Sequence, residues 1–173
     1  GQDELGGLLW DDTPSSSLST RELGQALHEV TATTGRRIDL IYLDACLMSM
    51  SEVAYELHDS ADYLLASENV SWTSFRYDRH LALDGGLSPL ELGKQWMRNE
   101  ADELRGDGVK PNYPFTYSLL DLRVMDDLLV AESALADTLT AELPLFRTQI
   151  RNAFLASGCF DGDQDYKLLP ADI

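Results

Sequence analysis

The sequence has few of the residues on which several large classes of protein depend. It contains three lysines and ten arginines against 30 acidic residues, which gives a formal net charge of −17. Nucleic acids and anionic membranes are therefore not expected as partners, because both attract basic surfaces. The chain also lacks a run of 18 apolar residues, so no segment is predicted to span a membrane. The acidic excess either attracts basic substrates or serves only as a solvated surface.

Ligands for metals and phosphates are also scarce. The only cysteines, Cys46 and Cys159, lie far apart and are both expected to be reduced, and the histidines form no zinc motif with them. No glycine-rich loop opens a predicted helix, which argues against a nucleotide-binding Rossmann or flavodoxin-like fold. Alternating carboxylates at 161–165 match the start of a calcium loop, but Asp172 stands where an EF-hand has its closing Glu. No cofactor is expected. Residues 161–165 are interpreted as a solvated loop, with a calcium site as the alternative.

The most informative residues follow an apolar run at 38–43. This run is short, rich in branched and aromatic residues and preceded by Gly35, so it predicts a buried strand. Cys46 would then lie just beyond the carboxyl end of the strand, where open parallel sheets gather their reacting groups. Cys46 is either a nucleophile or a small core residue. Asp44 favours the nucleophile, because a carboxylate in that position needs a role or a partner.

Helices and strands alternate along the rest of the chain. Ser19 and Glu22 form a capping box for a helix that ends at Gly35. The other predicted elements are a helix at 50–57, a buried strand at 61–67, a helix from Ser88 to about Leu104, a strand at 115–120, and helices from Asp121 to about Leu143 and from Leu145 to Ala156, with Pro144 between them. This alternation predicts one α/β domain with parallel strands and right-handed crossovers.

The block Asp44-Ala45-Cys46-Leu47-Met48, together with the strand that ends in Ala66-Ser67-Glu68, resembles the clostripain family of cysteine peptidases. Segments 8–13 and 18–23 resemble it too, and the likeness covers roughly residues 7–78. The resemblance implies a caspase-like α/β/α sandwich with a mostly parallel sheet. Residues 1–173 would be the C-terminal, nucleophile-bearing part of that peptidase domain, an incomplete domain that lacks its N-terminal strands.

The resemblance also implies an endopeptidase with a Cys–His dyad that cleaves after Arg or Lys. Cys46 matches the family's nucleophile, and Asp44 matches the acid that pairs with the basic side chain of the substrate. Ser67 and Glu68 would emerge beside Cys46 and hold the substrate if their strands are neighbours, although Glu68 would otherwise only cap or face solvent. Asp78 is the nearest candidate for a second acid in the same pocket.

One part of the family pattern is missing. The general base is a His followed by Gly, and none of His28, His58 and His80 is followed by Gly. Without an imidazole that takes up the thiol proton, Cys46 would be a weak catalyst. The chain is then a fragment of a longer peptidase, the second chain of a peptidase that cuts itself and keeps its own N-terminal chain as a partner, or a non-catalytic homologue. In the last case it would be a caspase-like peptide-binding or structural domain.

The expected partners are protein or peptide substrates with a basic residue before the scissile bond. The resemblance further suggests a secreted or cell-envelope prokaryotic protein.

Overall fold

The computed structural model describes residues 7–11, 13, 16–69, 71, 77–82, 85–105 and 116–157. The chain divides into two compact units, Gly1–Arg123 and Val124–Ile173, and each unit is described by itself. In the described part of the chain, no helix is both long enough and apolar enough to cross a membrane.

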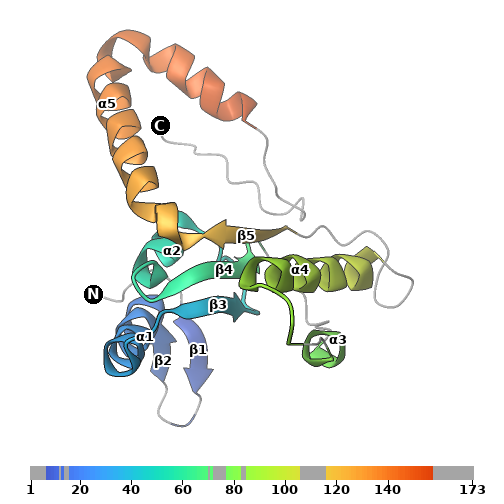
Figure 1. The fold of residues 1–173 in the computed structure, drawn as a ribbon. Helices are drawn as coiled ribbons and strands as arrows, with labels where there is room; N and C mark the ends of the chain where they lie inside the picture. The colour runs from blue at the N-terminus through green and yellow to red at the C-terminus, as the bar shows by residue number, and fades with distance from the viewer. Residues whose placement is uncertain are drawn as a thin grey trace. The chain divides into compact units, whose positions relative to one another are not determined.

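The first unit contains a three-stranded sheet in the order β3-β4-β5 and a separate hairpin (Figure 1). β3 (Ile38–Leu43) pairs with β4 (Ala61–Ser67) in parallel, whereas β5 (Tyr117–Asp121) pairs with β4 in the antiparallel direction. The hairpin joins β1 (Gly7–Asp11) to β2 (Ser16–Ser19). Parallel pairing is thus confirmed for β3 and β4 and wrong for β5. Two helices lie between β4 and β5, so the rule for a single crossover helix between parallel strands does not apply to this connection.

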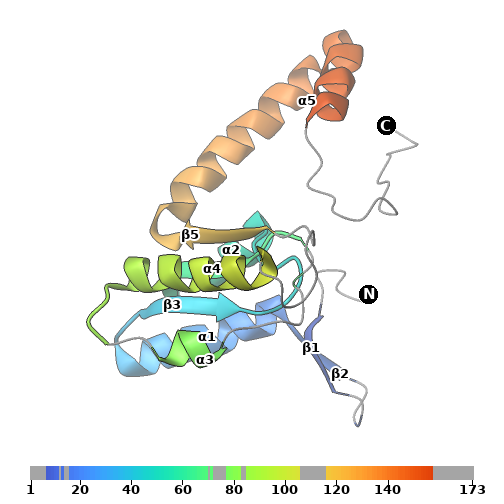
Figure 2. The same cartoon turned by 90° about the vertical axis from the view of Figure 1, so that its right-hand side faces the viewer.

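β4 is the centre of the core. All of its side chains except that of Asp62 are buried, and those of Leu64 and Leu65 are completely shielded from solvent. Successive side chains of a strand point to opposite faces, so both faces of the sheet are covered. α4 (Pro89–Arg105) contacts all three strands from one face, and α2 (Ser51–Leu57) lies on the other (Figures 1 and 2). The three layers form an α/β/α sandwich.

The helices of this sandwich begin where the sequence signals predict. In α1 (Thr20–Thr34), the Ser19 Oγ accepts a hydrogen bond from the Glu22 N–H (3.2 Å), and the Glu22 carboxylate accepts one from the Ser19 N–H (2.8 Å). α1 ends at Gly35, whose φ of 67° is the left-handed conformation that glycine adopts freely. The Glu91 N–H donates to the Ser88 Oγ over 3.3 Å, so Ser88 caps α4 as predicted.

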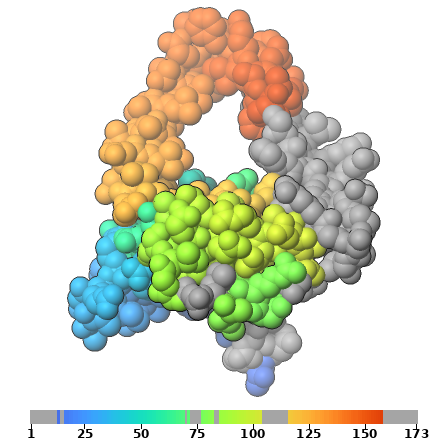
Figure 3. Space-filling view, turned by 45° about the vertical axis from the view of Figure 1, so that its right-hand side comes forward, coloured from blue at the N-terminus to red at the C-terminus, as the bar shows by residue number. Residues whose placement is uncertain are grey.

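A short helix, α3 (Tyr77–Leu81), packs against α4 (Figure 3). The His80 ring stacks on the Trp96 ring with their centroids 5.4 Å apart, and the Trp96 Nε1–H donates to the His80 carbonyl over 3.2 Å. His80 is therefore part of the packed interior and retains only 5% of its exposed surface.

The described part of the second unit consists mainly of a long helix, α5 (Met125–Ala156), and the short 3₁₀ helix η1 (Leu122–Val124) precedes it at the boundary of the two units. Pro144 lies inside α5, and Phe146 has non-helical angles (φ −120°, ψ 21°), so the predicted break near Pro144 is confirmed as a kink. Asp121 caps the 3₁₀ turn and not α5 itself. It ends β5, its carboxylate accepts a hydrogen bond from the Arg123 N–H of η1 over 3.1 Å, and the residue before α5 provides no side-chain cap.

Candidate functional site

The turn that follows β3 presents Cys46 to solvent. The next residue, Leu47, has a φ of 62°, which residues other than glycine rarely adopt because Cβ crowds the backbone. Two hydrogen bonds fix this turn against the end of β4: the Leu47 N–H donates to the Asn69 carbonyl, and the Ser49 N–H donates to the Ser67 carbonyl, each over 3.0 Å. The neighbouring strand therefore holds the turn in a conformation that the chain would not choose by itself.

A backbone amide is directed at the sulfur of Cys46. The Ser71 N–H donates to Sγ over 3.3 Å, and Sγ lies 3.8 Å from the Ser71 carbonyl oxygen. The Ser71 Oγ is in turn 2.8 Å from the hydroxyl of Tyr117 on β5. The thiol thus lies on an exposed turn at the carboxyl ends of β3 and β4, with Ser71 as its nearest polar neighbour.

Asp44 is exposed at the same end of β3. Burial is the main reason why the pKa of Tyr117 lies above its ordinary value of 10.0, and the negative charges of Glu100 and Asp44 raise it further. Asp44 is therefore within electrostatic reach of Tyr117, the residue that contacts Ser71. An acid, a phenol and a thiol come together around the end of one strand.

The other predicted site residues differ in their surroundings. Ser67 is fully buried, and its hydroxyl donates to the carbonyls of Thr116 (2.9 Å) and Asn69 (3.0 Å). Glu68 is exposed, and its carboxylate accepts a hydrogen bond from the Ser118 hydroxyl. Ser67 thus supports the sheet beneath the turn, and substrate binding by Ser67 and Glu68 stays a prediction.

Asp78, the predicted second acid, is exposed in the first turn of α3. It is close enough to His80 for its charge to oppose the lowering of the His80 pKa that burial causes. The structure thus relates Asp78 to α3 and His80, and its place in a substrate pocket stays a prediction.

A partly buried polar cluster joins β3 and β5 to α3 and α4. The Tyr42 hydroxyl of β3 donates to Oε1 of Glu100 on α4 over 3.3 Å, and the same Glu100 oxygen is 3.1 Å from Nε2 of His80. Tyr117 of β5 is close enough to Tyr42 for the two phenols to influence each other's pKa, and burial is the main reason why the pKa of both residues is raised. No local sequence pattern indicated this cluster, because it brings together residues from four elements that are up to 75 positions apart.

The model of the clostripain family matches residues 4–156, which is most of the sequence. The chain belongs to the clostripain family. It therefore belongs to a family of cysteine peptidases, as the block around Cys46 predicted. No match was found among curated proteins.

Solved structures of clostripain-like proteases share this fold. A cysteine protease from B. fragilis superposes with a TM-score of 0.54 at 19% identity, over 73% of this chain and 52% of that one. Two proteins from Bacteroides thetaiotaomicron are also similar. One is a secreted C11 cysteine protease in complex with an irreversible peptide inhibitor, with a TM-score of 0.49 at 21% identity over 73% of this chain and 39% of that one. The other is a clostripain in complex with a peptide inhibitor, with a TM-score of 0.47 at 20% identity over 69% of this chain and 50% of that one. The caspase-like fold is thus established, and the chain spans about half the length of the B. fragilis protease.

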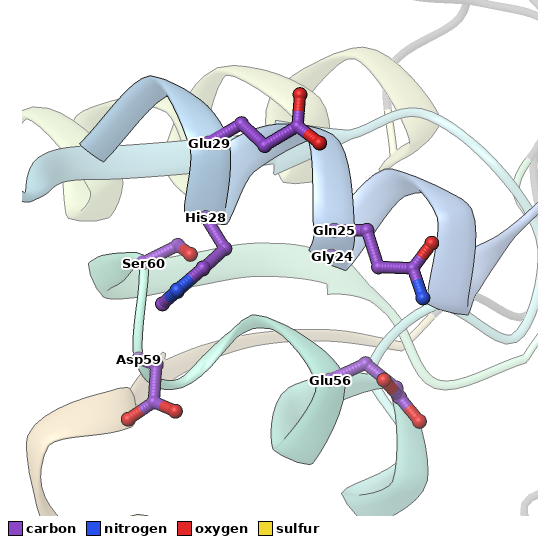
Figure 4. A pocket seen from close by; sticks show the side chains of 7 residues that line it. All are labelled: Gly24, Gln25, His28, Glu29, Glu56, Asp59 and Ser60. Carbon is purple, nitrogen blue, oxygen red and sulfur yellow. The ribbon is translucent and has the colours of Figure 1, made fainter. Parts of the chain in front are cut away.

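Each of the three histidines has its own surroundings in the fold. His28 lines a pocket of about 330 Å³ between α1 and the end of α2, with Glu29, Glu56 and Asp59 among its neighbours (Figure 4). The His58 ring stacks on Tyr55 with a centroid distance of 5.0 Å. His80 is buried against Trp96 and Glu100. Among the described residues, the polar contacts of the Cys46 sulfur are with the N–H and carbonyl groups of Ser71, so no general base is identified in this part of the chain.

The remaining site predictions concern metals. The alternating acids at 161–165 lie outside the described residues, so the calcium alternative stays untested. Within the described ranges, no group of three or more His, Cys, Asp and Glu side chains is arranged to hold a metal ion.

Proposed function

We propose that this chain carries the nucleophile and the specificity acid of a cysteine endopeptidase that cleaves after Arg or Lys. The observation that carries the proposal is the pair of exposed residues, Asp44 and Cys46, at the end of β3 in a chain of the clostripain family. The Cys46 thiolate would attack the scissile carbonyl. The Asp44 carboxylate would bind the guanidinium or ammonium group of the preceding residue through charge-assisted hydrogen bonds.

We further propose that the general base comes from a polypeptide segment upstream of this sequence. Among the described strands, β3 pairs only with β4, so the backbone groups along its outer edge are available to another strand. A strand that pairs there in parallel and ends in His would bring its imidazole to the edge where Cys46 lies. The segment would be part of the same chain or a processed chain that stays bound. A secreted or cell-envelope location stays a prediction from the family.

The alternative function is a peptide-binding or structural domain in which Cys46 performs no chemistry. The observation in its favour is that, among the described residues, the hydrogen-bond partner of the Cys46 sulfur is Ser71 and not His28, His58 or His80. In this case the acid of Asp44 would still bind basic side chains, but no covalent product would form.

Labelling with a peptidyl chloromethyl ketone distinguishes the two. The chain is incubated, alone and with its co-expressed upstream segment, with reagents that carry Arg or norleucine next to the reactive group, and the labelled cysteine is identified by peptide mapping. The peptidase proposal predicts labelling of Cys46 that requires both the Arg reagent and the upstream segment. Cys159 is an internal control for general thiol reactivity. Equal labelling of both cysteines by both reagents would favour the non-catalytic domain.

Asp44→Asn tests the specificity acid in the same assay. The loss of one charge-assisted interaction should lower the Arg-reagent labelling rate by roughly ten- to a hundredfold, with little change for the norleucine reagent. Asp39→Asn is the matched control, because Asp39 is an exposed acid at the other end of β3. If the labelling rate with the Arg reagent falls by the same factor in both variants, the effect reflects the general negative charge of the surface and not a specific pocket.

A further inference from the structure

Ser71 connects the thiol to the sheet through two different groups. Its backbone N–H donates to the Cys46 Sγ over 3.3 Å, and its side-chain Oγ lies 2.8 Å from the Tyr117 hydroxyl. Ser71 itself lies outside any helix or strand. The hydrogen bond to Tyr117 therefore joins Ser71, and through it the sulfur, to an element of regular structure.

Tyr117 is suited to act as this anchor because its own position is strongly determined. It is the first residue of β5 and pairs with Ser67 of β4. Its phenol also lies within electrostatic reach of Tyr42 of β3, which donates to Glu100 of α4 over 3.3 Å. A hydrogen-bonded chain thus runs from Tyr117 on β5 through Ser71 to the sulfur.

We propose that Tyr117 is a positioning residue for Cys46, which holds Ser71 so that the Ser71 N–H keeps the sulfur in place for attack. The proposal rests on the proposed function in one respect, namely that Cys46 is the nucleophile. An N–H directed at the sulfur interacts more strongly with a thiolate than with a thiol, and the thiolate is the attacking form. Tyr117 acts only through Ser71 and does not touch the substrate.

The phenol of Tyr117 keeps its proton under ordinary conditions. Burial holds the pKa of Tyr117 above 10.0, and the nearby charges of Glu100 and Asp44 act in the same direction. A neutral phenol can donate to the Ser71 hydroxyl or accept from it. The proposal therefore assigns the positioning of Ser71 to the hydroxyl of Tyr117 and not to its ring alone.

The test measures the rate at which iodoacetamide alkylates Cys46 in the 173-residue chain, by peptide mapping over time. Iodoacetamide is small and uncharged, so this rate does not depend on Asp44 or on any peptide pocket. Tyr117→Phe keeps the ring and removes the hydroxyl, whereas Ser71→Ala removes the other half of the same hydrogen bond. Each variant should react about fivefold more slowly than the wild type, the effect of one hydrogen bond.

Three comparisons separate positioning from a general structural effect. The double variant Tyr117→Phe/Ser71→Ala should react no more slowly than either single variant, because both changes remove one contact. Ser71→Thr keeps a hydroxyl and should keep the wild-type rate. Tyr55→Phe is the matched control, since Tyr55 lies on the exposed side of α2 and its ring stacks on His58. If Tyr117→Phe fails to fold, the comparison of Ser71→Ala with Ser71→Thr decides the question.

The proposal is overturned if Tyr117→Phe and Ser71→Ala both react at the wild-type rate, or if their effects multiply in the double variant. These outcomes are independent of the peptidase proposal. If the Arg chloromethyl ketone shows no selectivity for Cys46 but the iodoacetamide rates follow the expected pattern, positioning by Tyr117 stands and the proposed specificity fails.

Discussion

The Leu47 N–H donates a hydrogen bond to the Asn69 carbonyl over 3.0 Å, while the φ angle of Leu47 is 62°. The residue directly after the thiol is thus held in a left-handed conformation by the end of the neighbouring strand. Strained backbone of this kind persists only where surrounding structure enforces it, and it concentrates at functional sites. The relationship gives a direct test of how much strain this turn contains.

Leu47→Gly should stabilise the protein by about 1 kcal/mol. The left-handed conformation costs a leucine roughly 1–2 kcal/mol, and the greater freedom of an unfolded glycine offsets only part of that gain. The measurement is the free energy of unfolding from urea titration. Met50→Gly is the control, because Met50 is also exposed in this region but has an ordinary φ of −86°. Met50 is the N-cap residue of α2, where glycine is well tolerated, so this variant should change stability little, and an equally small change in Leu47→Gly would show that the turn is not strained.

Gly24→Ala should destabilise the protein although alanine favours helices. Gly24 lies inside α1, where the exchange would normally contribute about 1 kcal/mol of stability. A Cβ at this position, however, would lie 2.5 Å from the backbone carbonyl oxygen of Glu56 on α2. Moving the two helices apart should cost about 1–3 kcal/mol, so the net change is a loss. Thermal unfolding provides the measurement. Gly86→Ala has open space around the new Cβ and should be neutral, and a stabilised Gly24→Ala would contradict the close contact.

Stability should fall above pH 10 because of two tyrosines. Burial raises the pKa of Tyr42 and Tyr117 above 10.0 in the folded protein, whereas the unfolded chain releases these protons near that pH. Above pH 10 the folded state therefore holds protons that the unfolded chain has lost. The stabilisation that comes from these two phenols is complete below pH 10 and is lost as the pH rises through their pKa values in the folded protein. Urea unfolding at neutral and alkaline pH measures the loss. Tyr42→Phe should flatten the decline, and Tyr55→Phe should not; the same slope in both would argue against buried phenols.

Ser19→Ala should lower the free energy of unfolding by about 1 kcal/mol. The substitution removes the Oγ that accepts the Glu22 N–H and leaves an unpaired donor in the first turn of α1. Urea titration is again suitable, and Ser17→Ala, at an exposed position on β2, is the control. If both variants have the same stability, the capping box contributes nothing to the folded state.

Much of the fold could be predicted because its signals are local. The capping pairs at Ser19 and Ser88, the glycine that ends α1 and the limits of β4 each depend on a few adjacent residues. The kink after Pro144 follows from its missing N–H and the bulk of its ring. The antiparallel direction of β5 was not predictable from these signals, since it depends on the path of the chain through two helices.

The sequence by itself determined the family, the α/β alternation and an apolar strand that delivers Asp44 and Cys46 to its end, because a strand pattern and a motif are written in neighbouring residues. Only the tertiary structure decided what surrounds the sulfur. The amide of Ser71 reaches Cys46 across 25 positions and Tyr117 reaches Ser71 across 46, and the left-handed turn at Leu47 exists because Asn69 binds it. Contacts between such distant residues form when the strands pair and the core packs, and no local pattern of the chain specifies them.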